Sequence, residues 1–207
     1  YFNTQAMAAA SRREEFRQSL GLQPNRPIIL FAGKLLKRKH PLSLFKAWKQ
    51  LDHKTTRYPY LIYVGDGRER AELETLSASE KSLKILGFRN QSELPAFYDL
   101  ADVFVLPSKQ EPWGLSINEA MACNTAVITS DQCGCSSDLV DESCGIIFPA
   151  GNVDALTSAL SGILSQPGRA EKMGEAAWVK VSQWSFDQSI EGLTTAIKAV
   201  CPPPRKA

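Results

Sequence analysis

The stretch 33–40, GKLLKRKH, places four cations and a histidine directly after an apolar run at 27–32. Glycine lets a backbone turn tightly, and lysine ammonium groups can meet a phosphate as point charges. Lys34 and Lys39 are therefore candidates for an anion site. Charge alone also fits a solvated basic loop. It fits a nucleic-acid surface less well, because no aromatic residues interleave with these cations.

A second candidate lies at 107–122, where a loop with one glutamate leads into a helix with another. We expect the helix to begin near Gly114, which would leave the amides of Gly114, Leu115 and Ser116 free to bind a phosphate. Glu119 lies further along the helix, where a carboxylate can accept two hydrogen bonds from vicinal hydroxyls. By spacing alone, Glu111 and Glu119 also fit a surface residue and half of a helical ion pair.

Six short apolar runs separate these loops, and their continuous apolar character favours strands buried on both faces. We predict strands at 27–32, 60–64, 83–86, 103–106, 126–129 and 145–148. We predict helices near 3–21, 41–51, 67–78, 92–101, 114–123, 136–141, 152–165, 169–182 and 187–200, with Asn152 or Asp154 and Asp187 as N-caps. This alternation indicates an α/β fold, a Rossmann-like doubly wound parallel sheet of about six strands.

Both candidate loops follow a predicted strand. In an open parallel sheet, ligands bind at the carboxyl ends of the strands, where the helices begin. We therefore expect the two loops to meet at one edge of the sheet and to form one site.

The composition is that of a globular protein: 207 residues, 43% hydrophobic and 22% charged, with a formal net charge of +2. These values argue against a disordered chain and against an overall basic charge of the kind that binds nucleic acid. No run approaches the roughly 18 apolar residues of a transmembrane helix. Five cysteines, of which only Cys133 and Cys135 are close together, favour a reducing cytoplasm and plain buried or loop thiols. Two histidines and no Cys-x-x-Cys pair argue against a zinc site.

The string EPWGLSINEAMA at 111–122 closely resembles the glutamate-x-seven-glutamate signature of the group 1 family of retaining glycosyltransferases, which have the GT-B fold. Further segments match this family in the same order. FAGKLLKRK at 31–39 is similar to its glycine-arginine-leucine…lysine-glycine loop, and YVGDG at 63–67 to its strand-ending turn. LGF at 86–88, ELPAFY at 93–98 and ADVFVLPS at 101–108 resemble its next elements. The resemblance covers about residues 26–165.

The resemblance implies a site for a nucleotide-diphosphate sugar, of the UDP or GDP type. Lys34 and Lys39 would contact the donor diphosphate, together with the amides at Gly114, Leu115 and Ser116. Two lysines and a helix terminus can replace a metal ion in neutralising the departing diphosphate. Since the chain also has no Asp-x-Asp motif, we predict transfer without a metal or other cofactor.

The resemblance also assigns the rest of the donor. Glu119 would hold the ribose hydroxyls, and the backbone near Phe88 would face the base. Glu111 would touch the transferred sugar beside its anomeric carbon. We therefore expect Glu111, Lys39 and Lys34 to act in catalysis, in the synthesis of a polysaccharide or glycoconjugate.

A GT-B enzyme has two halves, and the resemblance identifies residues 1–207 as the carboxyl-terminal, donor-binding half. We expect a core at about 26–165, late helices at 169–200 and a tail at 201–207. The amino-terminal acceptor half would be absent, so this chain alone would bind donor without transferring sugar. The resemblance implies that the amino-terminal half is a partner of this chain and that any peripheral membrane contact runs through that half. It also implies a cytoplasmic location and no nucleic-acid partner.

Some positions depart from the family pattern. Lys34 replaces the usual arginine, and His40 stands where glycine is common, which favours a local packing or hydrogen-bonding role. We expect Trp113 to lie between loop and core, and Trp178 and Trp184 to be core or domain-contact residues. Two other functions stay open: a non-catalytic nucleotide-sugar-binding module, and a GT-B sugar-nucleotide epimerase or phosphorylase.

Overall fold

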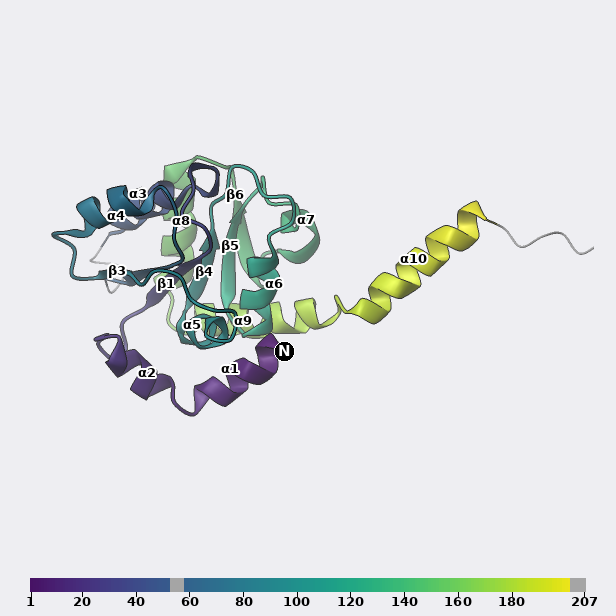
Figure 1. The fold of residues 1–207 in the computed structure, drawn as a ribbon, viewed down its shortest axis with the longest axis horizontal. Helices are drawn as coiled ribbons and strands as arrows, with labels where there is room; N and C mark the ends of the chain where they lie inside the picture. Colours follow the sequence, from purple (N-terminus) through teal and green to yellow (C-terminus); the bar gives the residue numbers. More distant parts are fainter. Residues whose placement is uncertain (53–57, 202–207) are drawn as a thin grey trace, which may run out of the picture.

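The computed structural model describes residues 1–52 and 58–201 of the chain. Six parallel strands form one sheet in the order β3-β2-β1-β4-β5-β6 (Figure 1). The strands are β1 (Ile28–Ala32), β2 (Tyr60–Val64), β3 (Leu83–Ile85), β4 (Val103–Leu106), β5 (Ala126–Ser130) and β6 (Gly145–Phe148). Each predicted strand is present, and the predicted fold class, a Rossmann-like parallel sheet, is confirmed.

Helices cover both faces of this sheet, and the last helix of the chain projects away from it (Figure 1). They are α1 (Phe2–Ala10), α2 (Arg13–Ser19), α3 (Pro41–Lys49), α4 (Arg70–Ser77), α5 (Leu94–Leu100), α6 (Leu115–Ala122), α7 (Ser136–Leu139), α8 (Val153–Leu164), α9 (Arg169–Ser182) and α10 (Phe186–Val200). One apolar cluster joins the sheet to α3, α4 and α8, and another joins it to α1, α5, α6 and α7. Figure 1 shows these two groups on opposite sides of the strands.

Alternation along β1 explains why the apolar runs are continuous. Leu30 packs into the cluster beneath α5 and α6, while Ile29 and Phe31 pack into the cluster beneath α3 and α8. Every residue of β1 and of β2 is buried. A strand covered on both faces has no side that tolerates polar side chains, so the sequence shows no alternation there.

The predicted helix at 3–21 is wrong, because the segment forms two helices that break at residues 11–12. Phe2 packs on Tyr98 with ring centroids 6.2 Å apart, and Phe16 packs on Phe97 at 5.0 Å. In one straight helix Phe2 and Phe16 would lie about 21 Å apart, yet their partners are adjacent residues of α5. The chain must therefore turn between them to bury both rings.

The late helices differ among themselves. Asn152 caps α8 by accepting a hydrogen bond from the Ala155 amide at 3.0 Å, as predicted. The predicted cap at Asp187 is wrong: Ser185 is the N-cap of α10, in a capping box with Gln188. The Ser185 amide donates to Gln188 Oε1 at 2.6 Å, and Asp187 already lies inside the first turn of the helix.

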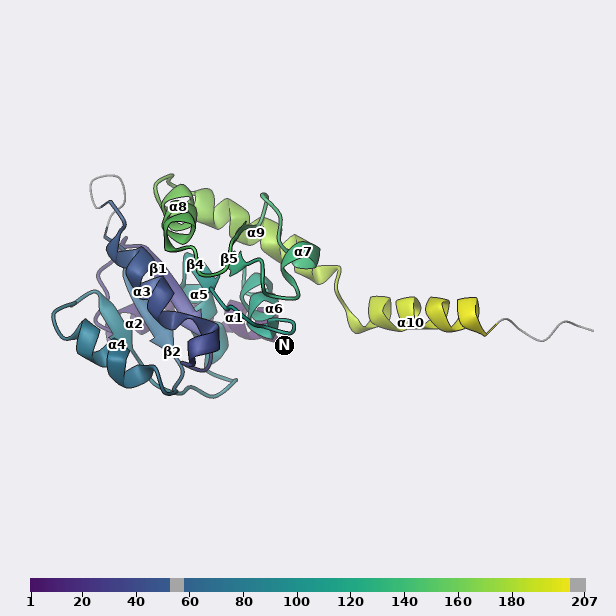
Figure 2. The same ribbon diagram turned by 90° about the horizontal axis from the view of Figure 1, so that it is seen from above.

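Helix α10 projects away from the body of the domain (Figures 1 and 2). Trp178 and Trp184, near its base, are 41% and 48% exposed, so a core position for them is wrong. Among the described residues, no helix is both long and apolar enough to cross a membrane. Most of the predicted tail, residues 202–207, lies outside the described part of the chain.

Candidate functional site

A cavity of about 610 Å³ opens at the carboxyl ends of the strands. It lies over β1 and β4, which are adjacent in the sheet although β2 and β3 separate them in the chain. This is the switch point at which open α/β sheets bind ligands. All eight predicted site residues line the cavity: Lys34, Lys39, Phe88, Glu111, Gly114, Leu115, Ser116 and Glu119.

Lys39 and Glu111 form an ion pair at one end of the cavity. Lys39 ends a 3₁₀ turn after β1, and Glu111 lies in the loop after β4. Both side chains are shielded from water, with 14% and 13% of their surface exposed. An ion pair with so little solvent is stronger than a surface pair. We call this the cationic end of the cavity, made by Lys34, Lys39, Glu111, Gly114 and Leu115.

Backbone hydrogen bonds hold the two loops of the cationic end together. The Lys109 amide donates to the Arg38 carbonyl at 2.8 Å, and the Arg38 guanidinium donates to the Gln110 carbonyl at 3.3 Å. The loop after β1 is fixed on its other side, where the Leu35 amide donates to the Asp66 carbonyl at 2.9 Å. The relative position of Lys39 and Glu111 is thus set largely by main-chain geometry.

A third loop, between β5 and α7, supports Glu111 from behind. The Gly134 amide donates to the Glu111 carbonyl at 3.0 Å, and the Cys135 amide donates to the Trp113 carbonyl at 3.0 Å. A side chain at Gly134 would come within 2.1 Å of the Pro112 carbonyl oxygen, which explains the glycine. Cys133 and Cys135 are buried free thiols, as predicted, and burial raises the pKa of Cys135 to about 12.

Two glycines let the turns after β1 and β2 touch each other. Gly65 has a φ of +136°, and a Cβ added there would lie 1.9 Å from the Gly33 carbonyl oxygen. The Gly33 amide donates to Val64 and the Gly65 amide donates to Gly87, at 2.9 and 2.8 Å. Successive turns are therefore joined across the strand ends, and the wall of the cavity is continuous backbone.

Helix α6 begins at the cavity with its amino end open. Gly114, its N-cap, has a φ of +105°, which only glycine adopts readily. In the described part of the chain, the Leu115 and Ser116 amides have no backbone or side-chain acceptor. Free amides and the positive end of the helix dipole together make a place for an anion.

Glu119 lies further along α6 and is held by Tyr98 of α5. The Tyr98 hydroxyl donates to Glu119 Oε2 at 2.8 Å. Burial raises the pKa of the Glu119 carboxyl above its usual value, and the hydrogen bond from Tyr98 opposes that rise. Burial and the nearby Glu119 charge also raise the pKa of Tyr98 well above 10, so the phenol stays protonated as a donor.

The opposite end of the cavity is formed by Phe88, Arg89 and Leu94, and we call it the aromatic end. Phe88 is 71% exposed although it is a large apolar residue. The sequence did not single out Arg89 or Tyr98 as site residues. Their only signal was position: Arg89 lies in the loop after a predicted strand, and Tyr98 lies in the helix that follows that loop.

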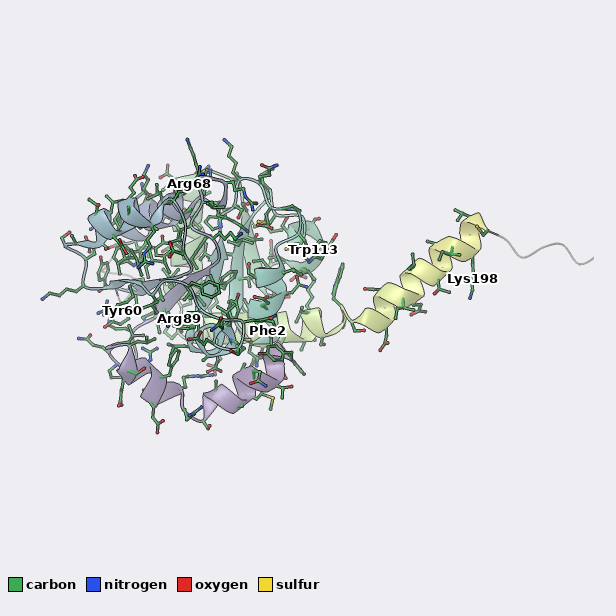
Figure 3. The ribbon with its side chains drawn as sticks, in the orientation of Figure 1. Phe2, Tyr60, Arg68, Arg89, Trp113 and Lys198 are labelled. Atoms are coloured by element: carbon green, nitrogen blue, oxygen red, sulfur yellow. The ribbon has the colours of Figure 1, made fainter. Side chains whose placement is uncertain are left out.

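Two further expectations concern His40 and Trp113. His40 Nδ1 lies 3.2 Å from the Ser43 hydroxyl, and the residue caps α3 in the left-handed conformation, which confirms a local role. Burial and the charge of Lys109 lower the pKa of His40. Trp113 lines the cavity, donates to the Asn118 side chain at 2.9 Å, and packs on Trp184 at 5.9 Å (Figure 3).

A second, larger cavity of about 780 Å³ lies near the amino ends of the strands. Several of its charged groups have partners within the protein. Arg13 forms a two-bond ion pair with Asp99, Arg17 donates to the Gln23 and Arg26 carbonyls, and Asp102 accepts from the Ile28 amide at 2.7 Å. These interactions join α2 and α5 to the start of β1, so we assign them a role in stabilising the fold.

Comparison with known proteins agrees with this architecture. Residues 12–179 match the family described as "Glycosyl transferases group 1". The match covers most of the chain, and the chain therefore belongs to the group 1 glycosyltransferase family, whose fold is GT-B.

Relatives and solved structures match over most of this chain. A D-inositol 3-phosphate glycosyltransferase of Gordonia bronchialis is 29% identical, over 89% of this chain and 43% of the relative. A GDP-mannose-dependent mannosyltransferase of Corynebacterium glutamicum, acting on a monoacylated phosphatidylinositol monomannoside, is 29% identical over 88% and 50%. The crystal structure of Anabaena HepE with UDP superposes with a TM-score of 0.77 at 24% identity, over 90% and 53%. The chain thus spans about half the length of these proteins.

Proposed function

We propose that this chain binds the nucleotide-diphosphate sugar donor of a glycosyltransferase. The transferase moves the sugar to an acceptor with retention of anomeric configuration. The observation that carries the proposal is the cationic end: the shielded Lys39–Glu111 pair lies in the same cavity as the open amino end of α6.

The diphosphate is assigned to the cationic end. Lys34 and Lys39 supply positive charge, and the Leu115 and Ser116 amides supply two directed donors. Charge builds up on the diphosphate as the bond to the sugar breaks, and fixed cations and amides stabilise that charge without reorganising. Within the described residues, no cluster of three or more His, Cys, Asp or Glu side chains is arranged to hold a metal. We assign leaving-group stabilisation to the lysines and the helix on the strength of the charge and the amides that they supply.

The ribose is assigned to Glu119. Its carboxylate has one oxygen bonded to Tyr98, and the other can accept from vicinal hydroxyls. The base then lies toward the aromatic end, with its face against the loop of Phe88.

The transferred sugar is assigned to the space beside Glu111. During transfer the bond from the anomeric carbon to the diphosphate oxygen breaks, and a bond from the same carbon to an acceptor oxygen forms. Glu111 lies next to Lys39, so its negative charge can stabilise the positive charge of the sugar while Lys39 faces the departing phosphate.

The acceptor is assigned to the part of the relatives' length that this chain does not span. Such a half would complete the cleft over the cavity and would carry any contact with a membrane surface. The named relatives act on inositol phosphate and on a phosphatidylinositol mannoside, which supports a role in glycoconjugate synthesis. We place this reaction in the cytoplasm.

Calorimetric titration of the chain with UDP, GDP and ADP, with and without EDTA, tests the proposal. We expect one nucleotide to bind in both conditions and to lose most of its affinity in Glu119→Ala. Glu171→Ala, at an exposed residue of α9 outside the cavity, is the matched control and should bind as the parent does. If none of the three nucleotides binds, the donor assignment is wrong for this chain. If EDTA abolishes binding, the metal-independent assignment is wrong.

A further inference from the structure

Arg89 has a buried donor that no described residue satisfies. Its Nε atom is shielded from solvent and has no hydrogen-bond partner among the described residues. Glu93 Oε1 lies 3.6 Å from Arg89 Nη1, too far for a hydrogen bond, and Glu93 Oε2 already accepts from the Asn90 amide at 2.8 Å. A buried donor without an acceptor is costly. The side chain lines the cavity, so a bound ligand is the group that can supply the missing acceptor.

The sheet topology places Arg89 at the base and not at the diphosphate. Arg89 follows β3, whereas Lys39 follows β1, and β2 lies between those strands. Two strand spacings amount to about 10 Å. The Tyr98–Glu119 hydrogen bond lies between the two ends of the cavity, and Glu119 is the residue assigned to the ribose. A nucleotide with its diphosphate at Lys39 and its ribose at Glu119 directs its base toward Arg89.

We propose that Arg89 reads the edge of the donor base and makes this chain select guanosine diphosphate over uridine and adenosine diphosphates. The proposal rests on the donor-binding function proposed above and adds to it the identity of the nucleotide.

The selectivity follows from what a guanidinium can donate. Arginine has five N–H donors in a planar fork and no acceptor. Guanine presents two adjacent acceptors, O6 and N7, which match that fork. Adenine offers N7 beside an amino group, which is itself a donor and opposes the fork. In uracil the two carbonyl oxygens flank the N3–H donor, so one edge cannot offer two adjacent acceptors. Guanine is the base that uses the fork fully.

Glu93 helps to hold the fork in place. Its carboxylate is fixed by the Asn90 amide and lies on the Nη1 side of the guanidinium. The charge of Glu93 therefore orients Arg89 without using its buried Nε donor. Figure 3 shows Arg89 beside α5, apart from Arg68, an exposed arginine that does not line the cavity.

The test is calorimetric titration of the parent chain, Arg89→Ala and Arg89→Lys with GDP, 7-deaza-GDP, UDP and ADP. Arg68→Ala is the matched control. In the parent we expect GDP to bind roughly 5- to 100-fold more tightly than UDP or ADP, the range of one bidentate arginine–guanine contact. Replacing N7 by a C–H group in 7-deaza-GDP should weaken binding to the parent and to Arg68→Ala.

In Arg89→Ala the advantage of GDP should disappear, and GDP and 7-deaza-GDP should bind equally. Arg89→Lys keeps the charge but loses the fork, so it should behave like Arg89→Ala toward 7-deaza-GDP. Tighter binding of UDP than of GDP to the parent would overturn the assignment. An equal loss for all four nucleotides in Arg89→Ala would also overturn it, since that pattern means stacking or charge and not base reading. If the parent binds none of the nucleotides, the donor-binding function itself fails, which is a separate result.

Discussion

The cationic and aromatic ends of the cavity are built in different ways. At the cationic end, the loops after β1, β4 and β5 are joined to one another by main-chain hydrogen bonds, and glycines let them touch. At the aromatic end, the side chains of Phe88 and Arg89 project from one loop, and one buried donor is left open. Main-chain contacts fix the shape of the cationic end, whereas individual side chains form the aromatic end.

This difference separates the two parts of the function. A diphosphate is common to all the candidate donors, so its binding site can depend on amides, turns and a few charges. The base differs among donors, so its recognition falls to side chains that can change without disturbing the sheet. We therefore assign binding of the diphosphate to the cationic end and the choice of nucleotide to the aromatic end.

The largest expected effect comes from breaking the backbone contact between the turns after β1 and β2, which holds Gly33 at the start of the loop that carries Lys34 and Lys39. In Gly65→Ala, the new Cβ would meet the Gly33 carbonyl oxygen at 1.9 Å, at a φ of +136° that strains any other residue. We expect a loss of about 3 kcal/mol in the free energy of unfolding, measured by chemical denaturation. Gly162→Ala is the control: it lies in α8 with no atom within 4 Å of a new Cβ. It should stabilise the chain by about 0.5–1 kcal/mol. Equal effects of the two changes would contradict a backbone-built cationic end.

The next effect concerns the charge at the same end. In Lys39→Met we expect nucleoside diphosphates to bind about 30-fold more weakly, because a hydrogen bond to a charged group contributes about 2 kcal/mol. The change also leaves Glu111 without its ion-pair partner, close to the diphosphate. Calorimetric titration with the preferred nucleoside diphosphate, and separately with its free nucleoside, measures the change in affinity.

Binding of the free nucleoside should stay unchanged, since it has no phosphate to lose. Lys46→Met, on the exposed side of α3, is the control and should bind as the parent does. A loss of nucleoside binding equal to the loss of diphosphate binding would place Lys39 outside the phosphate site.

The same contrast decides what could be predicted from the sequence. The strands and the cationic end could be predicted, because continuous apolar runs mark buried strands and the functional residues directly follow them. Tyr98 and Arg89 could not, because their roles depend on how α5 packs beside α6 and on a loop whose shape no local pattern encodes. The break between α1 and α2 was missed for a related reason. It is imposed by two adjacent aromatic partners on α5 and not by the propensity of residues 11–12.

The smallest expected effect lies between the two ends, at the Tyr98–Glu119 hydrogen bond. In Tyr98→Phe, Glu119 loses the donor that lowers its pKa, so burial alone remains and its pKa rises further. Ribose hydroxyls donate to the ionised carboxylate, so nucleotide affinity should fall on acidification, and the fall should begin at a higher pH in the variant. At pH 7.5 we expect less than about a threefold loss, since one hydrogen bond is exchanged. Binding titrations between pH 5 and pH 8 measure this shift. Protonation of the ligand affects the parent and the variant equally, so it cancels when the two are compared.

Two controls assign that shift to Glu119. With a 2′,3′-dideoxy nucleotide, which has no diol, parent and variant should show the same pH dependence. The contribution of this carboxyl to the stability of the free protein should respond in the opposite sense. The folded-state pKa of Glu119 lies above its unfolded value, so its contribution to stability is present at acidic pH and is lost as pH rises through the folded-state pKa. Acidification should thus weaken the binding of nucleotide while this carboxyl favours folding. If the affinity fell only at the pH values where the free protein unfolds, the loss would reflect unfolding, and the assignment of the ribose to Glu119 would fail.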